Sequence, residues 1–240
     1  MRDVGGAFQD ILESGDYTVE TKVRINDVDY QEDVIWSMSS KRGLFKEERP
    51  MIGGAVTGEI ELTMDDPEID FPKMATIIPY VRLKQQRENF IYRSGWIQKG
   101  EFFIDTRKKN EDSGTIYIHG YDAMRKTQAS YPSSTYTWNS EGPTAYQVVS
   151  EIARHIGVRL DSRTTDKLDS TEYVIGFPAQ YSMHEVLESI AGMYGGNFCM
   201  SDEGKLLLVG FKDFPVESWY LVTENGDYIT FGGTRILLRP

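Results

Sequence analysis

The sequence predicts an α+β protein, with an N-terminal antiparallel β-barrel followed by a small α/β domain that contains two amphipathic helices. Three observations support this fold class. Residues 17–121 contain several short runs in which apolar and polar residues alternate. Residues 144–195 contain two apolar stripes at helical spacing, each behind a capping signal. Residues 219–238 return to a strand-like pattern.

The first strands are predicted by alternation. Residues 17–25 alternate almost without a break, residues 34–39 form a second strand around Trp36, and residues 55–64 form a third. The charged stretch 41–49 between the last two is predicted to be a loop. Each of these strands therefore has one face available for a core.

Further strands follow turn signals. A fourth is predicted around residues 77–83, where Pro79 has no backbone N–H and therefore favours a sheet edge or a bulge. Gly100 lies in the turn before residues 102–104, and residues 115–121 form another strand. A succession of short strands predicts a barrel or a sandwich.

Helices follow the strands. Asp122 is a suitable N-cap for a short helix, and residues 130–142 have the composition of a linker. Thr144 and Gln147 form a capping box, and the apolar stripe that follows ends at Gly157. The helical pattern after residues 182–185 repeats this arrangement with Ser and Glu and ends at the glycine pair 195–196.

These patterns set the predicted domain boundaries. Residues 198–201 and 205–209 flank a turn and are predicted to form a hairpin. The strands of residues 215–240, with an Asn225-Gly226 turn, indicate either a return to the first barrel or a chain cut before a second domain. We predict a β-barrel domain over residues 1–125, completed by strands from 215–240, and an α/β insert over 126–214.

Composition excludes several classes of protein. Acidic residues outnumber basic ones by 37 to 26, and the resulting net charge of −11 disfavours nucleic-acid binding through phosphate contacts. Cys199 is the single cysteine, so no internal disulfide can form. No long apolar segment is present at the N-terminus or elsewhere. We expect a soluble protein that is made in the cytoplasm and does not enter a membrane.

No histidine is predicted to be catalytic. His119 with Asp122 has the residue types of a general base and its orienting carboxylate, but no nucleophile motif accompanies them. We therefore predict that His119 is a half-exposed strand residue. His155 falls in the last turn of the first predicted helix, where positive charge is favoured, and His184 falls near the start of the second.

The remaining candidates have structural explanations. The carboxylate pairs Glu59 with Glu61 and Asp65 with Asp66 fit a solvated strand face and a turn. The glycine pairs lack the spacing of phosphate-binding loops. We predict no catalytic, cofactor-binding or metal-binding residue, no cofactor, and no enzymatic activity. The tryptophans are predicted to lie mainly in the core, whereas Trp138 in the linker is an alternative candidate for an anchor between subunits. The tryptophans are Trp36, Trp96, Trp138 and Trp219.

Several segments together resemble one known family. The order of these segments and their amino-acid sequences resemble the N-terminal portion of baseplate-hub, or tail-hub, proteins of tailed bacteriophages and prophages. The resemblance implies a first barrel, an α/β insert and a later second barrel, which is missing here. The segments are residues 54–64, 77–83, 96–104, 117–124 (Tyr-Ile-His-Gly-Tyr-Asp-Ala-Met), 145–157 and 182–201.

The resemblance implies a structural role in the virion tail, assembled in the bacterial host cytoplasm. Such subunits form a homotrimeric ring that joins the hexameric tail tube to a trimeric spike or fibre, so the expected partners are other tail proteins, without sequence-specific nucleic-acid binding. Because like charges suppress phosphate binding, we expect acidic residues such as Glu59 and Glu61 to line the DNA channel. The alternatives are a receptor- or carbohydrate-binding tail module and a tail-associated cell-wall hydrolase.

Overall fold

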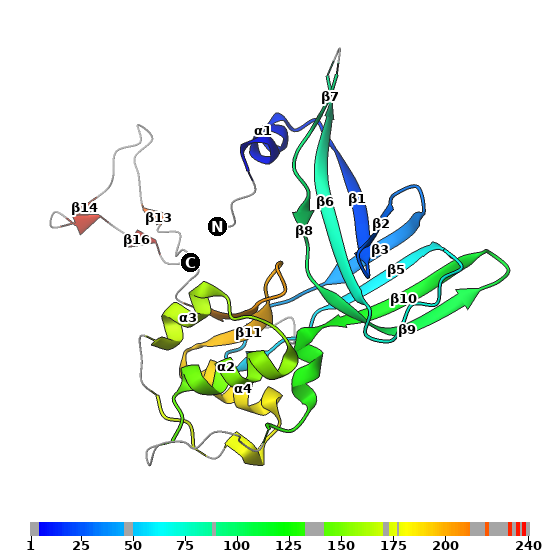
Figure 1. Ribbon diagram of the computed structural model, residues 1–240. Helices are drawn as coiled ribbons and strands as arrows, with labels where there is room; N and C mark the ends of the chain where they lie inside the picture. Colours follow the sequence, from blue (N-terminus) through cyan, green and yellow to red (C-terminus); the bar gives the residue numbers. More distant parts are fainter. Residues whose placement is uncertain are drawn as a thin grey trace. The chain divides into compact units, whose positions relative to one another are not determined.

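The structure is a computed structural model of a chain that divides into two units, Met1–Val209 and Gly210–Pro240. An antiparallel sheet dominates the first unit and helices accompany it, which agrees with the predicted α+β class (Figure 1). The structure describes residues 5–45, 50–87, 90–132, 142–169, 173–176 and 178–211, and the backbone of residues 219–220, 230–231, 234–235 and 237–238.

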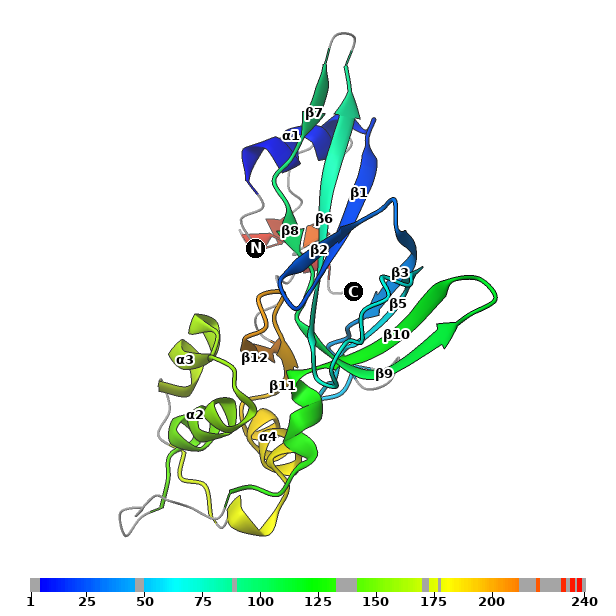
Figure 2. The same ribbon diagram turned by 45° about the vertical axis from the view of Figure 1, so that its right-hand side comes forward.

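The main sheet of the first unit contains nine strands among the described residues, in the order β2-β1-β6-β9-β10-β5-β3, with β7 and β8 also paired to β6 (Figures 1 and 2). Its pairings are antiparallel. The strands are β1 (Thr18–Ile25), β2 (Val28–Gln31), β3 (Ile35–Lys41), β5 (Glu59–Asp65), β6 (Thr76–Gln86), β7 (Ile91–Arg93), β8 (Ile97–Gln98), β9 (Phe102–Asn110) and β10 (Thr115–Asp122).

One face of this sheet carries the first hydrophobic core. Alternate residues of β1, β5, β9 and β10 point into it, as the period of two requires. Leu62 and Met64 of β5 lie beside Ile116 and Ile118 of β10, and all four are fully buried. Phe71, from the loop before β6, covers the same cluster. The alternation in the sequence therefore identified the buried face correctly.

The described strands do not close into the predicted barrel. In the described part of the chain no ladder joins β2 to β3, so the sheet is open. The chain turns at residues 32–34 from β2, which pairs with β1, into β3, which pairs with β5. Alternation specifies which face is buried, but closure depends on whether the edge strands reach one another, and the local pattern carries no information on that.

Pro79 lies neither on an edge strand nor at a bulge of the β1–β6 ladder, in contrast to the prediction. It lies inside β6, opposite Val23 of β1, and β6 has partners on both sides. The Pro79 carbonyl accepts a hydrogen bond from the Lys99 backbone N–H, so its backbone polar groups point toward the β8 and β9 side. On that side the β9 ladder ends at Ile77 and the β8 ladder begins at Tyr80. Because Pro79 lies between the two ladders, its missing N–H costs no ladder hydrogen bond.

The second core belongs to the α/β part of this unit. Helix α4 packs against β11 and β4 of the sheet β12-β11-β4, and α2 packs against α4, α3 and η1. Val149, Ile152, Leu187 and Phe198 are buried in this core. Its elements are β4 (Gly54–Ala55), the 3-10 helix η1 (Ala123–Gln128), α2 (Ala145–Ile156), α3 (Ser162–Asp169), the 3-10 helix η2 (Pro178–Gln180), α4 (Met183–Met193), β11 (Gly196–Met200) and β12 (Leu206–Gly210).

The predicted helix starts are confirmed. Thr144 and Gln147 form a complete capping box at α2, and Ser182 and Glu185 form one at α4. Asp122 caps η1 by accepting a hydrogen bond from the Met124 backbone N–H. Two of the described α-helices were not predicted from the sequence: α1 (Gly6–Ser14), which buries only Ile11, and α3, whose buried face consists of Thr164 and Leu168. Stripes this sparse give little periodic signal.

A close backbone contact within the main sheet explains one glycine. A β-bulge lies between His119 and Gly120, where the register of β10 against β9 shifts. A Cβ atom on Gly120 would lie 2.6 Å from the Phe103 carbonyl oxygen. Glycine is therefore the residue that lets the two strands approach at this point.

The second unit contains short strands, as predicted for residues 215–240. They form two antiparallel pairs, β13 with β16 and β14 with β15. The predicted Asn225-Gly226 turn and most of the predicted 130–142 linker lie outside the described residues. The strands are β13 (Trp219–Tyr220), β14 (Thr230–Phe231), β15 (Thr234–Arg235) and β16 (Leu237–Leu238).

Candidate functional site

His119 and Asp122 both belong to β10, but their side chains contact different partners. The His119 ring packs edge-on against Tyr121, with centroids 4.7 Å apart, and its Nε2 atom lies 3.5 Å from a Glu59 carboxylate oxygen. Asp122 is buried and accepts hydrogen bonds from the Gly58 and Met124 backbone N–H groups. The Asp122 carboxylate therefore binds backbone N–H groups and does not orient the His119 imidazole. This arrangement agrees with the interpretation of His119 as a non-catalytic residue.

Burial also changes the acidity of Asp122. Loss of solvation raises its pKa to about 7, against an ordinary value of 3.8, although the two backbone N–H donors and the nearby Arg42 oppose this shift. Arg42 itself pairs with Asp202 in the turn between β11 and β12. Asp122 thus connects β10 to β5 and η1, in surroundings that favour its protonated form.

His184 belongs to a buried network with Thr127 and Glu188, which has the residue types of a catalytic triad: a hydroxyl, an imidazole and a carboxylate. Its Nδ1 atom lies 3.0 Å from the Thr127 hydroxyl oxygen, and its Nε2 atom lies 3.5 Å from a Glu188 carboxylate oxygen. However, the Thr127 hydroxyl donates to the Met124 carbonyl at 2.6 Å, and Thr127 is fully buried. A hydroxyl in this position cannot reach a substrate, so the network fixes α4 against η1. His155 is exposed in the last turn of α2, as predicted.

The carboxylates of β5 lie on the outer face of the main sheet. The Tyr117 hydroxyl donates a hydrogen bond of 3.3 Å to Glu61, next to the contact between Glu59 and His119. Asp66 pairs with Lys109 at 2.8 Å, and Asp65 accepts a hydrogen bond from Trp36. Within the described residues no group of three or more His, Cys, Asp or Glu side chains has the arrangement of a metal site.

Trp36 is not a core residue, in contrast to the prediction. It occupies the bulge of β3 between Ile35 and Ser37, and its side chain is 64% exposed. Its indole N–H donates to the Asp65 carboxylate at 2.7 Å, which fixes the ring on the surface. Trp96 is partly buried. Trp138 and the side chain of Trp219 lie outside the described residues.

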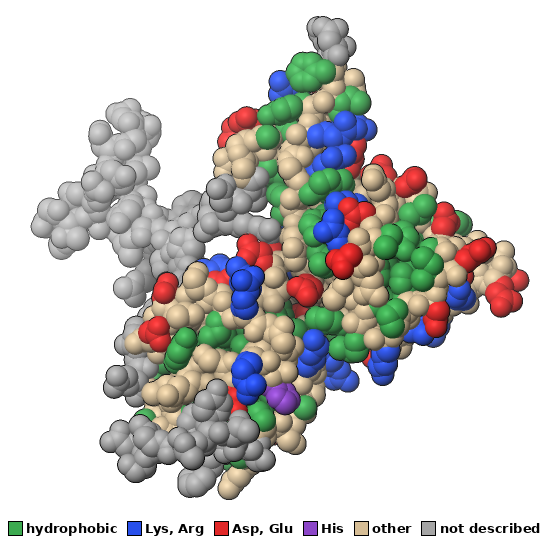
Figure 3. Space-filling view, in the orientation of Figure 1, with side chains coloured by type: hydrophobic (Ala, Val, Ile, Leu, Met, Phe, Trp, Pro, Cys, Tyr) green, Lys and Arg blue, Asp and Glu red, His purple; other side chains and the backbone are tan. Residues whose placement is uncertain are grey.

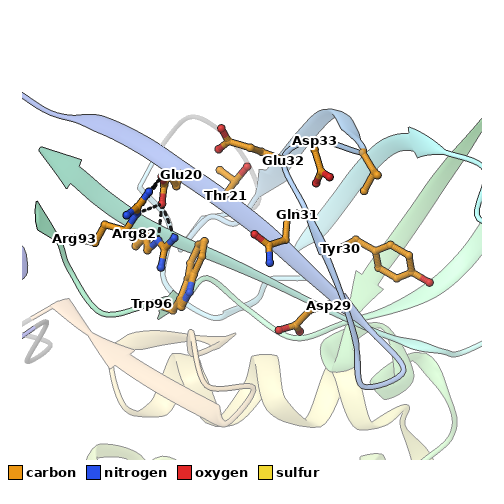
Figure 4. A pocket seen from close by; sticks show the side chains of 11 residues that line it. Glu20, Thr21, Asp29, Tyr30, Gln31, Glu32, Asp33, Arg82, Arg93 and Trp96 are labelled. Atoms are coloured by element: carbon orange, nitrogen blue, oxygen red, sulfur yellow. Dashed lines mark hydrogen bonds and ion pairs between the residues drawn. The ribbon is translucent and has the colours of Figure 1, made fainter. Parts of the chain in front are cut away.

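A charged cleft beside β1 is the candidate functional site. Strand β2 pairs only with residues 22–25 of β1, and a cleft of about 640 Å³ opens where β2 ends (Figure 4). Its charged groups come from four strands, β1, β2, β6 and β7, and from the turn after β2. The cleft is lined by Glu20, Thr21, Asp29, Tyr30, Gln31, Glu32, Asp33, Val34, Arg82, Arg93 and Trp96.

Glu20 is the centre of one end of this cleft, which we call the cationic end. Arg82 and Arg93 hydrogen-bond to its carboxylate at 2.6 and 3.0 Å, and Lys84 lies 3.4 Å away. These bonds, that from Arg93 above all, lower the pKa of Glu20 to about 2. The cationic end therefore consists of Arg82 and Arg93 from the cleft lining, together with the adjacent Lys84, around one ionised carboxylate.

Two cations of this region, Arg82 and Lys22, lie over aromatic rings. The Arg82 guanidinium lies 4.2 Å from the centre of the Trp96 ring, and the Lys22 ammonium lies 5.0 Å from the Tyr80 ring. Lys22 also pairs with Asp29, and this bond, together with a stronger one from Arg24, lowers the pKa of Asp29 to about 2. The sequence did not predict this cluster because Glu20 and Arg82 are 62 residues apart in the chain, although the alternation of charged residues in both strands was visible.

A second charged cleft, of about 670 Å³, provides a contrast. It lies between the start of α3 and the β11–β12 turn, and its cations and carboxylates match one to one. Arg163 pairs with Asp161, and Lys205 pairs with Glu203, as Arg42 does with Asp202. Because each of these cations is neutralised by its own carboxylate, this cleft has no excess charge that would indicate a ligand.

Comparison with known proteins identifies a shared fold. No family model and no curated protein sequence matches the chain. Among solved structures, the 43 kDa tail protein of prophage MuSo2 from Shewanella oneidensis is similar, with a TM-score of 0.51 and 14% identity over 80% of this chain and 56% of that one. The tail protein from Neisseria meningitidis MC58 is similar with a TM-score of 0.52 and 12% identity, over 83% of this chain and 53% of that one.

The chain therefore shares its fold with a prophage tail protein and with a second tail protein. The chain spans little more than half the length of each of them. Among the described residues, no helix has both the length and the apolar character that a membrane span requires.

Proposed function

We propose that this chain is a structural component of a bacteriophage or prophage tail, a hub subunit that acts by assembly and not by catalysis. The observation that carries the proposal is the fold shared with two tail proteins over at least 80% of the chain. It agrees with the order of strands and capped helices in the sequence, which resembles tail-hub proteins. In this role the protein is located in the virion tail.

The hub role requires a ring. Three copies would join the hexameric tail tube to a trimeric spike or fibre, with other tail proteins as partners. The open edges of β2 and β3 are free within the described residues to receive further strands. Completion of the barrel by the strands of residues 215–240 is part of this proposal.

Light scattering combined with negative-stain microscopy tests the ring. We expect particles of three copies around a central hole at micromolar concentration. A strictly monomeric protein over a hundredfold concentration range would contradict the hub role.

The proposed ring would surround the DNA channel, and Glu59 and Glu61 are candidates for its lining because they lie on the outer face of β5. Glu59→Lys with Glu61→Lys should create DNA retention that high salt abolishes, since lysines bind phosphate through counterion release. Asp10→Lys with Glu13→Lys changes the charge equally on exposed positions of α1 and is the matched control. Equal retention by both double variants would contradict the channel assignment.

The exposed Trp36 favours a second candidate, a receptor- or carbohydrate-binding tail module, because sugars stack on exposed aromatic rings. Glycan binding that is lost in Trp36→Ala, by a protein that does not form rings, would favour this candidate. The cell-wall hydrolase is tested by incubation with purified cell walls, where the hub role predicts no cleavage.

A further inference from the structure

The cationic end of the cleft has more positive charge than its own carboxylate neutralises. Arg82, Lys84 and Arg93 share Glu20, whose side chain is only 13% exposed, whereas the Lys84 and Arg93 side chains are 32% and 37% exposed. Figure 3 shows Lys and Arg side chains gathered over β6 and β7 on a chain of net charge −11.

These cations are held in fixed positions. Glu20 accepts from the Nε atoms of both arginines, and the Trp96 ring supports Arg82. An arginine has five N–H donors, so each guanidinium retains donors for a further anion. Because their side chains are already ordered, binding an anion costs little additional conformational entropy.

The opposite end of the cleft is acidic. Glu32 and Asp33, in the turn after β2, line it away from the arginines (Figure 4). In the described part of the chain, neither carboxylate has an ion-pair partner. The cleft therefore has a positive end and a negative end, with the unpaired edge of residues 18–21 of β1 beside it.

We propose that this cleft binds an extended segment of a partner protein, with carboxylates toward the cationic end and basic side chains toward Glu32 and Asp33. An extended backbone fits because the free edge of β1 offers main-chain hydrogen bonds for strand addition. A nucleic acid fits less well, since a continuous phosphate backbone meets repulsion at the acidic end. This docking site goes beyond the proposed ring and does not depend on it.

The probe is a fluorescent peptide of three glutamates, four glycines and three lysines, measured by anisotropy at low salt. We expect wild type to bind it about tenfold more tightly than a twenty-nucleotide single-stranded DNA. Lys84→Gln with Arg93→Gln should weaken peptide binding about fivefold or more. Glu32→Gln with Asp33→Asn should weaken it similarly, but strengthen binding of an all-glutamate peptide.

Lys73→Gln with Lys108→Gln is the matched control, because both lysines are exposed on other parts of the main-sheet region. It removes the same charge and should bind the peptide as wild type does. Circular dichroism and thermal unfolding establish that each variant is folded. Absent peptide binding, equal losses in the control and cleft variants, or DNA binding as tight as peptide binding would each overturn the proposal.

Discussion

Asp122 makes the stability of this protein depend on pH in an unusual direction. Burial raises its pKa to about 7, whereas in the unfolded chain the value returns to about 3.8. Between these two values the folded state binds a proton that the unfolded state releases. The stabilisation from this group is therefore fully present below about pH 3.8 and is lost progressively as the pH rises to about 7, the reverse of an ordinary ion-paired aspartate.

The size of the effect follows from the shift. Each unit of pKa difference corresponds to about 1.4 kcal/mol, so raising the pH from 5 to 8 should cost about 2 to 3 kcal/mol through Asp122. Asp122→Asn removes the titration. The free energy of unfolding of wild type minus that of D122N should therefore fall by about this amount between pH 5 and pH 8.

Urea unfolding followed by circular dichroism at several pH values measures this difference. Ionisable groups that are common to both proteins cancel in the subtraction. Glu20 and Asp29 have lowered pKa values, so the stabilisation that they contribute is lost as the pH falls below about 4. That change lies outside the interval from pH 5 to pH 8 and does not affect the measurement. Asp166→Asn on the exposed surface of α3 is the control and should keep the wild-type dependence. Parallel curves for wild type and D122N would refute the assignment.

Three further variants test the packing. Gly120→Ala should lower the free energy of unfolding by about 2 kcal/mol or more, because its Cβ would lie 2.6 Å from the Phe103 carbonyl oxygen; an unchanged urea midpoint would contradict this close contact. Thr144→Ala should cost about 1 kcal/mol by removing the α2 cap, whereas Thr144→Ser should retain most of it. Leu62→Ala should cost about 2 to 5 kcal/mol in thermal unfolding, and Val19→Ala, at an exposed strand position, should cost far less.

The local features of the fold were predictable where short-range chemistry specifies them. The capping boxes at Thr144 and Ser182 involve residues three apart, and each starts its helix as predicted. Asp122 caps η1 through a hydrogen bond to Met124, two residues away. The weakly patterned helices α1 and α3 were missed because their stability comes from a few tertiary contacts.

The candidate site was not predictable in the same way. Glu20 meets Arg82 and Arg93 because β1, β6 and β7 are neighbours in the sheet, and no rule of spacing along the chain implies that order. Trp36 illustrates the same limit, since a bulge turns a residue with a core-like pattern toward solvent.

The sequence by itself determined the strand faces, the capped helices, the acidic charge and the absence of a known catalytic motif, because these depend on neighbouring residues or on composition. Only the tertiary structure decided that the main sheet is open, that Pro79 lies within a central strand, and that three cations share Glu20. The physical reason is that strand order and register join residues far apart in the chain, and that choice is made by the packing of the whole core.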